Sequence, residues 1–292
     1  MSTPPQGKLA LPKLAEMKRR GERIVMVTAY DAPGARFAED AGIDIVLVGD
    51  TAAMVVLGYD GTVPVTMDEM LFLTRTVVRA ARRPIVIGDM PFGSYQVSDE
   101  AAVENAIRFI KEARADAIKL EGAGPSVSRA RAIVGAGIPV MGHVGLTPQS
   151  ATMLGGFKTQ GKTSEAARRL VAEALELEAA GCFAVVLEAV PAPVGAEITR
   201  RLTVPTIGIG AGADCDGQVL VYHDLLGLTE GHLPRFVKRY ASLSGEIRDA
   251  LTAYVTDVRS GAFPEEQHTY SIHAHELEEF EAGLADRIHE RE

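Results

Sequence analysis

Five consecutive apolar segments of the chain end in residues that can bind a metal ion or move a proton. In chain order these residues are Asp50, Thr51, Asp89, Lys119, Glu121, His143 and Glu188. Four of the seven are carboxylates, one is an amine and one is an imidazole. If the segments bring them together, they could hold a divalent cation and place a general base beside it.

A crowded set of carboxylates favours a bound cation. Carboxylates that share a cleft repel one another and raise each other's pKa unless a positive charge joins them. Oxygen ligands without a neighbouring cysteine or pair of histidines suit Mg²⁺, which takes one or two carboxylates and keeps several waters. Such an ion would hold an anionic substrate despite the net charge of −9. It would also stabilise the enolate formed when a neighbouring C–H group loses its proton.

The elements that must position these residues are short runs of Val, Ile and Leu bounded by Gly or Pro. Eight such runs occur, at 24–30, 43–49, 84–90, 117–122, 138–145, 183–190, 205–212 and 219–227. They are apolar throughout instead of alternating with polar residues, which is typical of parallel strands buried on both faces.

Helical patterns lie between these runs. Thr66 and Glu69 form a capping-box signal before an amphipathic stretch, and similar stretches follow Ser98 and Thr163. The section 228–259 also has a helical pattern. Eight strands that are each followed by a helix or a loop of similar length predict an α/β fold, the (β/α)8 barrel. A doubly wound open sheet is the alternative, but no G-x-G-x-x-G motif follows the first strand.

A barrel would place all these polar residues on one rim, because the carboxyl ends of its strands lie together. Side chains alternate along a strand, so Lys119 and Glu121 point to one side and the apolar residues beside them point to the other. Apolar side chains that face outward pack on the helices. We therefore expect Lys119 and Glu121 to face the barrel interior.

Composition limits the class of partner. An acidic chain of 292 residues disfavours nucleic acid and anionic membranes, which attract basic surfaces. Two distant cysteines exclude a disulfide framework, and no apolar stretch resembles a signal peptide or a membrane span. We expect a cytoplasmic protein that acts on small molecules. Its expected parts are a disordered tail (1–8), the barrel with an N-terminal helix (9–262) and a polar, helical extension (263–292) that packs on the barrel or on a partner subunit.

Several blocks of the sequence together resemble one enzyme family. They are VGDTAAMVVLGYDGTVPVTMDEM (48–70), GDMPFGSY (88–95), IKLEG (118–122), GHVGLTPQ (142–149), LEAVP (187–191), IGIGAGADCDGQVLVYHDLLG (207–227) and FVKRYA (236–241). Their order and spacing resemble the 3-methyl-2-oxobutanoate hydroxymethyltransferases, also called ketopantoate hydroxymethyltransferases.

The resemblance implies a barrel of the phosphoenolpyruvate/pyruvate-binding superfamily type, assembled as a homodecamer of two pentamers. It implies transfer of a one-carbon unit from 5,10-methylenetetrahydrofolate to 3-methyl-2-oxobutanoate, which gives 2-dehydropantoate in pantothenate biosynthesis. The expected cofactor is one Mg²⁺ per subunit.

Site roles follow from the same resemblance. Asp50 and Asp89 correspond to direct Mg²⁺ ligands, with Glu121 completing the metal site. The 2-oxo acid and its metal are contacted by Asp50, Thr51, Asp89, Lys119 and His143, and Glu188 corresponds to the proton acceptor. The family usually has Ser where this chain has Thr51, and Ala52-Ala53 replaces the commoner Leu-Gly. Neither change removes a charged group, so we expect activity to be retained.

Other readings of these residues stay open. Lys119 could be the nucleophile of a Schiff-base aldolase, although the acidic Glu121 beside it favours the charged ammonium. The chain could be a metal-dependent carbon–carbon lyase, although it lacks a KKCGH loop, or a non-catalytic barrel that only binds a 2-oxo acid, which would not need Glu188. The glycines around 208–212 suggest a loop that shapes the site, with phosphate binding as the alternative.

Overall fold

The computed structural model describes residues 7–150, 156, 158–231 and 233–289. Eight parallel strands form a closed barrel in which each strand pairs with its neighbours in sequence and β8 pairs with β1, so the predicted fold is confirmed. The strands are β1 (Ile24–Thr28), β2 (Ile45–Val48), β3 (Ile85–Asp89), β4 (Ala117–Lys119), β5 (Val140–Gly145), β6 (Ala184–Glu188), β7 (Thr206–Ile209) and β8 (Gly217–Leu220). No described helix is both long enough and apolar enough to span a membrane.

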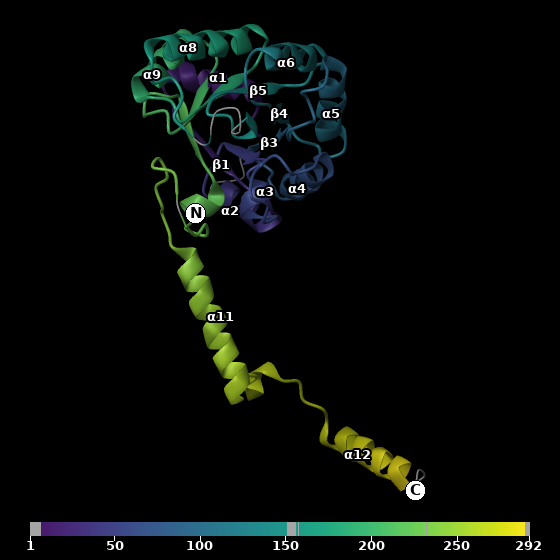
Figure 1. Cartoon of the computed structure of the whole chain (residues 1–292). Helices are drawn as coiled ribbons and strands as arrows, with labels where there is room; N and C mark the ends of the chain where they lie inside the picture. Colours follow the sequence, from purple (N-terminus) through teal and green to yellow (C-terminus); the bar gives the residue numbers. More distant parts are fainter. Residues whose placement is uncertain (1–6, 151–155, 157, 232, 290–292) are drawn as a thin grey trace. The chain divides into compact units, whose positions relative to one another are not determined.

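Helices surround the strands (Figure 1). They are α2 (Ala32–Asp40), α4 (Met67–Ala80), α5 (Asp99–Lys111), α6 (Pro125–Gly135), α8 (Ser164–Ala179) and α9 (Ala192–Arg201). The expected capping box of α4 is present, since Thr66 and Glu69 exchange side-chain and backbone hydrogen bonds. Ser98 and Thr163 cap α5 and α8 as predicted, each accepting a backbone N–H three residues later. Side-chain caps of this kind satisfy amides that would otherwise lack partners at the helix start.

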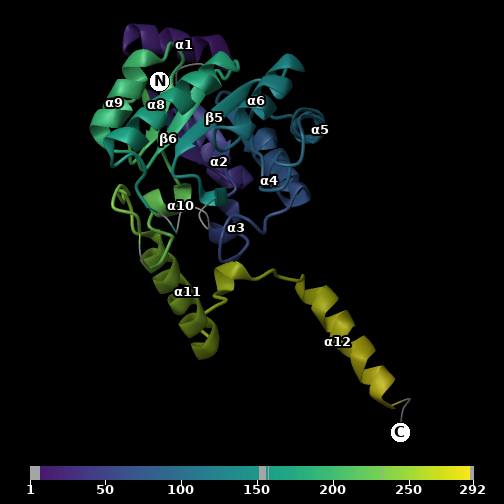
Figure 2. The same cartoon turned by 45° about the horizontal axis from the view of Figure 1, so that its top comes forward.

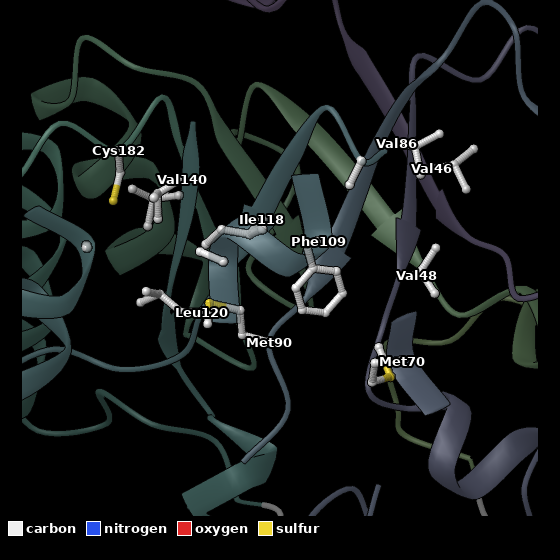
Figure 3. Packing of buried hydrophobic residues seen from close by; sticks show 14 of the residues in the cluster. Val46, Val48, Met70, Val86, Met90, Phe109, Ile118, Leu120, Val140 and Cys182 are labelled. Carbon is white, nitrogen blue, oxygen red and sulfur yellow. The ribbon is translucent and has the colours of Figure 1, made fainter. Parts of the chain in front are cut away.

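The strands separate two apolar layers because their side chains alternate in direction. On β2, Ile45 and Leu47 point into the barrel, whereas Val46 and Val48 point outward toward the helices. Figure 3 shows part of the outer layer, with Phe109 of α5 among side chains of the neighbouring strands. This alternation decides which polar residue at a strand end reaches the barrel interior.

One end of the barrel is closed by α1 (Leu11–Arg20), whose Leu14 and Met17 join the inner layer. Figure 2 shows α1 at this end, with α3 (Ala52–Val55) and α10 (Tyr222–Leu225) at the opposite end. The carboxyl ends of the strands therefore remain available for a site at the end away from α1.

Two sequence predictions were wrong near the end of the barrel. The segment 219–227 is not one strand, because β8 ends at Leu220 and the helical turn α10 follows. Tyr222 and Leu225 of this turn continue the apolar run that begins at Val219, so the pattern did not show where the strand ends. Among the described residues of the section 228–259, the helix begins at residue 243, with α11 (Leu243–Ser260).

The chain divides into two compact units, Met1–Ala241 and Ser242–Glu292. The second unit contains α11, the short 3-10 helix η2 (Glu266–His268) and α12 (Ala274–His289). Within it, the ring of Phe263 lies 5.8 Å from that of Tyr254 and 5.2 Å from that of His268. The domain boundaries expected from the sequence stay a prediction, and residues 1–6 of the expected tail lie outside the described residues.

Candidate active site

All seven residues singled out in the sequence line one cavity at the carboxyl ends of the strands. They come from β2 to β6 and the turns directly after them, and they are Asp50, Thr51, Asp89, Lys119, Glu121, His143 and Glu188. The cavity has a volume of about 50 Å³, room for a few water-sized groups. Its apolar wall includes Met26, Leu47 and Val186 from the inner layer.

Strand alternation explains why these side chains converge. On β4 and just after it, Ala117 faces the inner layer, Ile118 and Leu120 face the helices, and Lys119 and Glu121 face inward. The same two-residue period brings Asp89, His143 and Glu188 to the interior on their own strands. The expectation for Lys119 and Glu121 is therefore confirmed.

A buried ion pair joins β3 and β4. Asp89 and Lys119 are partners in the strand register, and the Nζ of Lys119 donates to both oxygens of Asp89, at 2.8 and 2.9 Å. Burial lowers the pKa of Lys119, but the charges of Asp89 and the nearby carboxylates outweigh it and raise that pKa above its usual value. Lys119 is therefore a fixed positive charge in the cavity.

Asp50 carries the least compensated charge of the site. It is 2% exposed, and burial together with the charges of Asp89 and Glu121 raises its pKa well above the usual value. Burial also raises the pKa of Asp89, although Lys119 opposes this. For Glu121 the balance is reversed, because Lys119 and His143 outweigh burial and lower the pKa of that carboxyl.

His143 lies between two carboxylates. Its Nδ1 is 3.5 Å from an oxygen of Glu121, and its Nε2 is 3.4 Å from an oxygen of Glu188. Both distances exceed those of well-formed hydrogen bonds, so we treat these contacts as ion pairs. Burial alone would lower the pKa of His143, but the two carboxylates outweigh it and raise the pKa to about 9. The imidazole is therefore protonated at neutral pH in this arrangement.

Three residues of the site were missed by the sequence analysis. Gln149 donates hydrogen bonds to the carboxylates of Asp50 and Glu121, and the hydroxyl of Tyr95 donates to Gln149. The hydroxyl of Tyr30 lies 2.7 Å from the Oγ1 of Thr51. Tyr95 and Gln149 are the final letters of two of the motif blocks, GDMPFGSY and GHVGLTPQ. Neither residue directly follows a strand, so the search of strand ends did not find them. Their place in the two motif blocks was the one signal that could have indicated a role in the site.

The donor set suits a divalent cation. Three buried carboxylates, Asp50, Asp89 and Glu121, face the single ammonium of Lys119, and the high pKa of Asp50 reflects the negative charge left over. A carboxylate offers only oxygen atoms as metal ligands, and Mg²⁺ prefers oxygen ligands. Within the described part of the chain, no three His, Cys, Asp or Glu side chains already stand in a metal-holding arrangement. Mg²⁺ needs only one or two direct carboxylates, so this does not conflict with such a site.

Two other candidate features lie outside this cavity. The first is Gly212, which has a φ of +93° and where an added Cβ would lie 2.6 Å from the Cβ of Ala192. Close packing against Ala192 therefore explains why this position is a glycine. The second is His223 of α10, a histidine whose ring centroid lies 5.5 Å from that of Tyr30 and 5.8 Å from that of Tyr222.

Comparisons with known proteins match one enzyme family. A family model described as ketopantoate hydroxymethyltransferase matches residues 8–266. A 3-methyl-2-oxobutanoate hydroxymethyltransferase of Thermobifida fusca is 56% identical over 264 residues, covering 90% of this chain and 94% of that protein. One of Moorella thermoacetica is 57% identical over 265 residues, covering 91% of this chain and 98% of that protein.

Solved structures give the same fold at low identity. A phosphoenolpyruvate phosphomutase of Streptomyces platensis has a TM-score of 0.59 and 16% identity, covering 97% of this chain and 98% of that chain. A 2,3-dimethylmalate lyase, described as a member of the PEP mutase/isocitrate lyase superfamily, has a TM-score of 0.57 and 16% identity, covering 89% and 91%. These two proteins therefore share the barrel fold of this chain.

Proposed function

The chain belongs to the ketopantoate hydroxymethyltransferase family, and on this basis we propose how its cavity carries out the reaction. It is a hydroxymethyltransferase, which acts on 3-methyl-2-oxobutanoate and forms 2-dehydropantoate for pantothenate biosynthesis. The one-carbon donor is 5,10-methylenetetrahydrofolate, as the sequence resemblance implies. The family assignment therefore argues against the alternative of a barrel that binds a 2-oxo acid without catalysis.

The substrate binds at the inward-facing side chains of β2 to β4. Lys119 supplies the positive charge that attracts the carboxylate of the 2-oxo acid, and Thr51 offers a hydroxyl as donor or acceptor. Tyr30 contacts that hydroxyl at 2.7 Å and so restricts its rotation. His143 adds a second positive charge to the cavity.

Asp50 and Asp89 are the side chains that would hold Mg²⁺ directly, with Glu121 completing the metal site through water. The buried excess of negative charge at these three residues supports this assignment. When bound, Mg²⁺ would withdraw electron density from the carboxylate and ketone oxygens of the 2-oxo acid, which acidifies the C3 proton.

Glu188 is the base. Its side chain is 15% exposed, more than those of Asp89, Lys119 and Glu121, so it reaches the open part of the cavity. It takes the proton from C3 of the substrate, and the resulting enolate carbon attacks the one-carbon unit. The unit that is attacked is formaldehyde, which forms when water adds to the one-carbon unit and both of its bonds to folate nitrogens break, leaving tetrahydrofolate. After the attack, the formaldehyde oxygen takes up a proton and becomes the hydroxyl of the new hydroxymethyl group. His143, 3.4 Å from the Glu188 carboxylate, orients the base.

The single observation that carries this mechanism is the convergence of Glu188, His143, Glu121, Lys119 and Asp89 through a chain of contacts across one barrel mouth. The test is NMR of C3 deuterium exchange in 3-methyl-2-oxobutanoate, with and without Mg²⁺ and tetrahydrofolate. Exchange that needs Mg²⁺ supports enolisation at this site. Exchange at the same rate in EDTA would contradict it.

Two assignments extend beyond the cavity. A homodecamer of two pentamers and one Mg²⁺ per subunit follow from the family resemblance. Sedimentation of the purified chain would test the decamer, and metal analysis after equilibration with Mg²⁺ would test the stoichiometry.

A further inference from the structure

The side chain of Gln149, in the short 3-10 helix η1 (Pro148–Ser150), connects two carboxylates of the cavity. Its Nε2 donates to the Oδ2 of Asp50 at 3.0 Å and to the backbone carbonyl of Met90 at 2.9 Å. Its backbone N–H donates to the Oε2 of Glu121 at 3.1 Å. One residue therefore holds carboxylates that come from β2 and β4.

Tyr95 fixes the orientation of this amide. Its hydroxyl donates to the Oε1 of Gln149 at 2.6 Å and accepts the backbone N–H of Glu121 at 3.2 Å. Since the carbonyl of Met90 can only accept, and the hydroxyl donates to Oε1, the positions of the amide nitrogen and oxygen are determined by their partners. Gln149 is 6% exposed and Tyr95 is 2% exposed, so water does not replace these contacts.

The chemistry of the amide matters as well as its position. A neutral donor can orient a carboxylate without cancelling its charge, whereas a lysine in the same place would form an ion pair. Lys119 pairs in this way with Asp89, but Asp50 receives the neutral Gln149. The amide contacts Oδ2 of Asp50 and does not engage Oδ1. Asp50 is thus oriented while its negative charge stays available to a cation.

We propose that Gln149 is a positioning residue for the divalent-cation site: it fixes Asp50 and Glu121 relative to each other, and Tyr95 fixes its amide. This inference rests on the proposed function, since it assumes that these carboxylates hold a cation. Gln149 therefore affects the affinity for the cation and does not contact the reacting atoms. Partners that orient metal-binding side chains typically change metal affinity by about 10- to 100-fold when they are removed.

The test compares cation binding by wild-type protein and by Gln149→Leu. Isothermal titration with Mg²⁺ alone gives the Kd, and electron paramagnetic resonance with Mn²⁺ as the probe reports how the ion is held. We expect the Kd of Gln149→Leu to rise by about 10- to 100-fold. At saturating Mg²⁺ its kcat should return to within about threefold of wild type, because the residue acts through the metal site. A variant that remains impaired at every Mg²⁺ concentration would contradict a positioning role.

The matched control is Gln218→Leu. Gln218 is exposed, and its amide also donates to a backbone carbonyl, that of Gly212 at 2.9 Å, but it contacts no carboxylate of the cavity. Its removal should leave the Kd for Mg²⁺ unchanged. Comparing the two variants separates the loss of any glutamine amide from the loss of this one.

Tyr95→Phe keeps the proposal testable if Gln149→Leu does not fold. It removes one oxygen from the same network and should weaken Mg²⁺ binding in the same direction. In the double variant the two effects should be less than additive, because both act through one amide. Folded Gln149→Leu or Tyr95→Phe protein with a wild-type Kd for Mg²⁺ would overturn the positioning role alone. Wild-type protein that binds neither Mg²⁺ nor Mn²⁺ would overturn the proposed function along with it.

Discussion

The Nζ of Lys119 lies 2.8 and 2.9 Å from the two carboxylate oxygens of Asp89, in an ion pair that is almost fully buried. Breaking such a pair leaves an uncompensated charge inside the protein, which costs about 3–5 kcal/mol. The pair and the neighbouring carboxylates keep Lys119 protonated. A Schiff base requires the neutral amine, so this relationship argues against the aldolase reading of the same residue.

Borohydride should therefore trap no adduct on this protein. Incubation with 3-methyl-2-oxobutanoate and borohydride should leave the intact mass unchanged, because the charged ammonium of Lys119 does not attack a ketone. Mass spectrometry of the whole chain measures this directly. A mass increase that maps to Lys119 in the peptide digest would restore the aldolase mechanism.

Mg²⁺ should raise the melting temperature. A ligand at a hundred times its Kd stabilises the folded state by about 2.7 kcal/mol, and each kcal/mol shifts Tm by about 2–4 °C in a chain of roughly this size. We expect a rise of about 5–10 °C between EDTA and saturating Mg²⁺. Differential scanning calorimetry measures it, and equal melting temperatures in the two conditions would contradict a cation site.

Asp50→Asn separates charge repulsion from metal binding. The raised pKa of Asp50 means that folding disfavours its ionised form at neutral pH. In EDTA the variant should therefore melt at the same temperature as wild type or higher. In Mg²⁺ it should lose most of the stabilisation seen for wild type, because one ligand is gone. Full stabilisation by Mg²⁺ would remove Asp50 from the metal site.

Gly145→Ala should impair the site through the backbone. Gly145 pairs with Glu188 in the strand register and has a φ of +100°, where an added Cβ would lie 2.2 Å from the carbonyl oxygen of Glu188. Strain of this kind costs about 1–3 kcal/mol, and it would displace the base. Gly135→Ala in α6 is the control, since a Cβ there meets nothing within 4 Å. Comparable activity in the two variants would show that Gly145 is not required.

Neither cysteine should react in the folded protein at pH 8. Burial raises the pKa of Cys182 to about 12, and burial also raises the pKa of Cys215. Only the thiolate attacks Ellman's reagent, so Cys182 stays unreactive until the pH approaches 12. Both thiols should titrate after denaturation in guanidinium. Rapid reaction of native protein at pH 8 would show that one of them is accessible and ionised.

The barrel and most of the cavity could be predicted because they depend on local patterns. Runs of Val and Ile bounded by Gly or Pro identified seven strands and overlapped the last two residues of β8. The two-residue period placed Lys119 and Glu121 inside the barrel. The same patterns failed at 222–225, where the sequence YHDL forms a helical turn. There the backbone N–H of Tyr222 donates to the hydroxyl of Thr28, a contact 194 residues away in sequence that no local pattern contains.

Gln149 was harder to predict for a related reason. Its partners Asp50, Met90, Tyr95 and Glu121 come from three different loops or strand ends, so only the folded barrel brings them together. The cytoplasmic location, the decamer and the folate co-substrate stay predictions from the sequence.

Proton removal by Glu188 is tested most directly by Glu188→Gln, with Glu104→Gln as an exposed control on α5. Glutamine keeps the shape of the side chain but cannot accept the C3 proton. We predict that Glu188→Gln binds 3-methyl-2-oxobutanoate with Mg²⁺ as wild type does, while deuterium exchange at C3 falls by about 10²- to 10⁴-fold. Exchange at the wild-type rate in this variant would contradict the account.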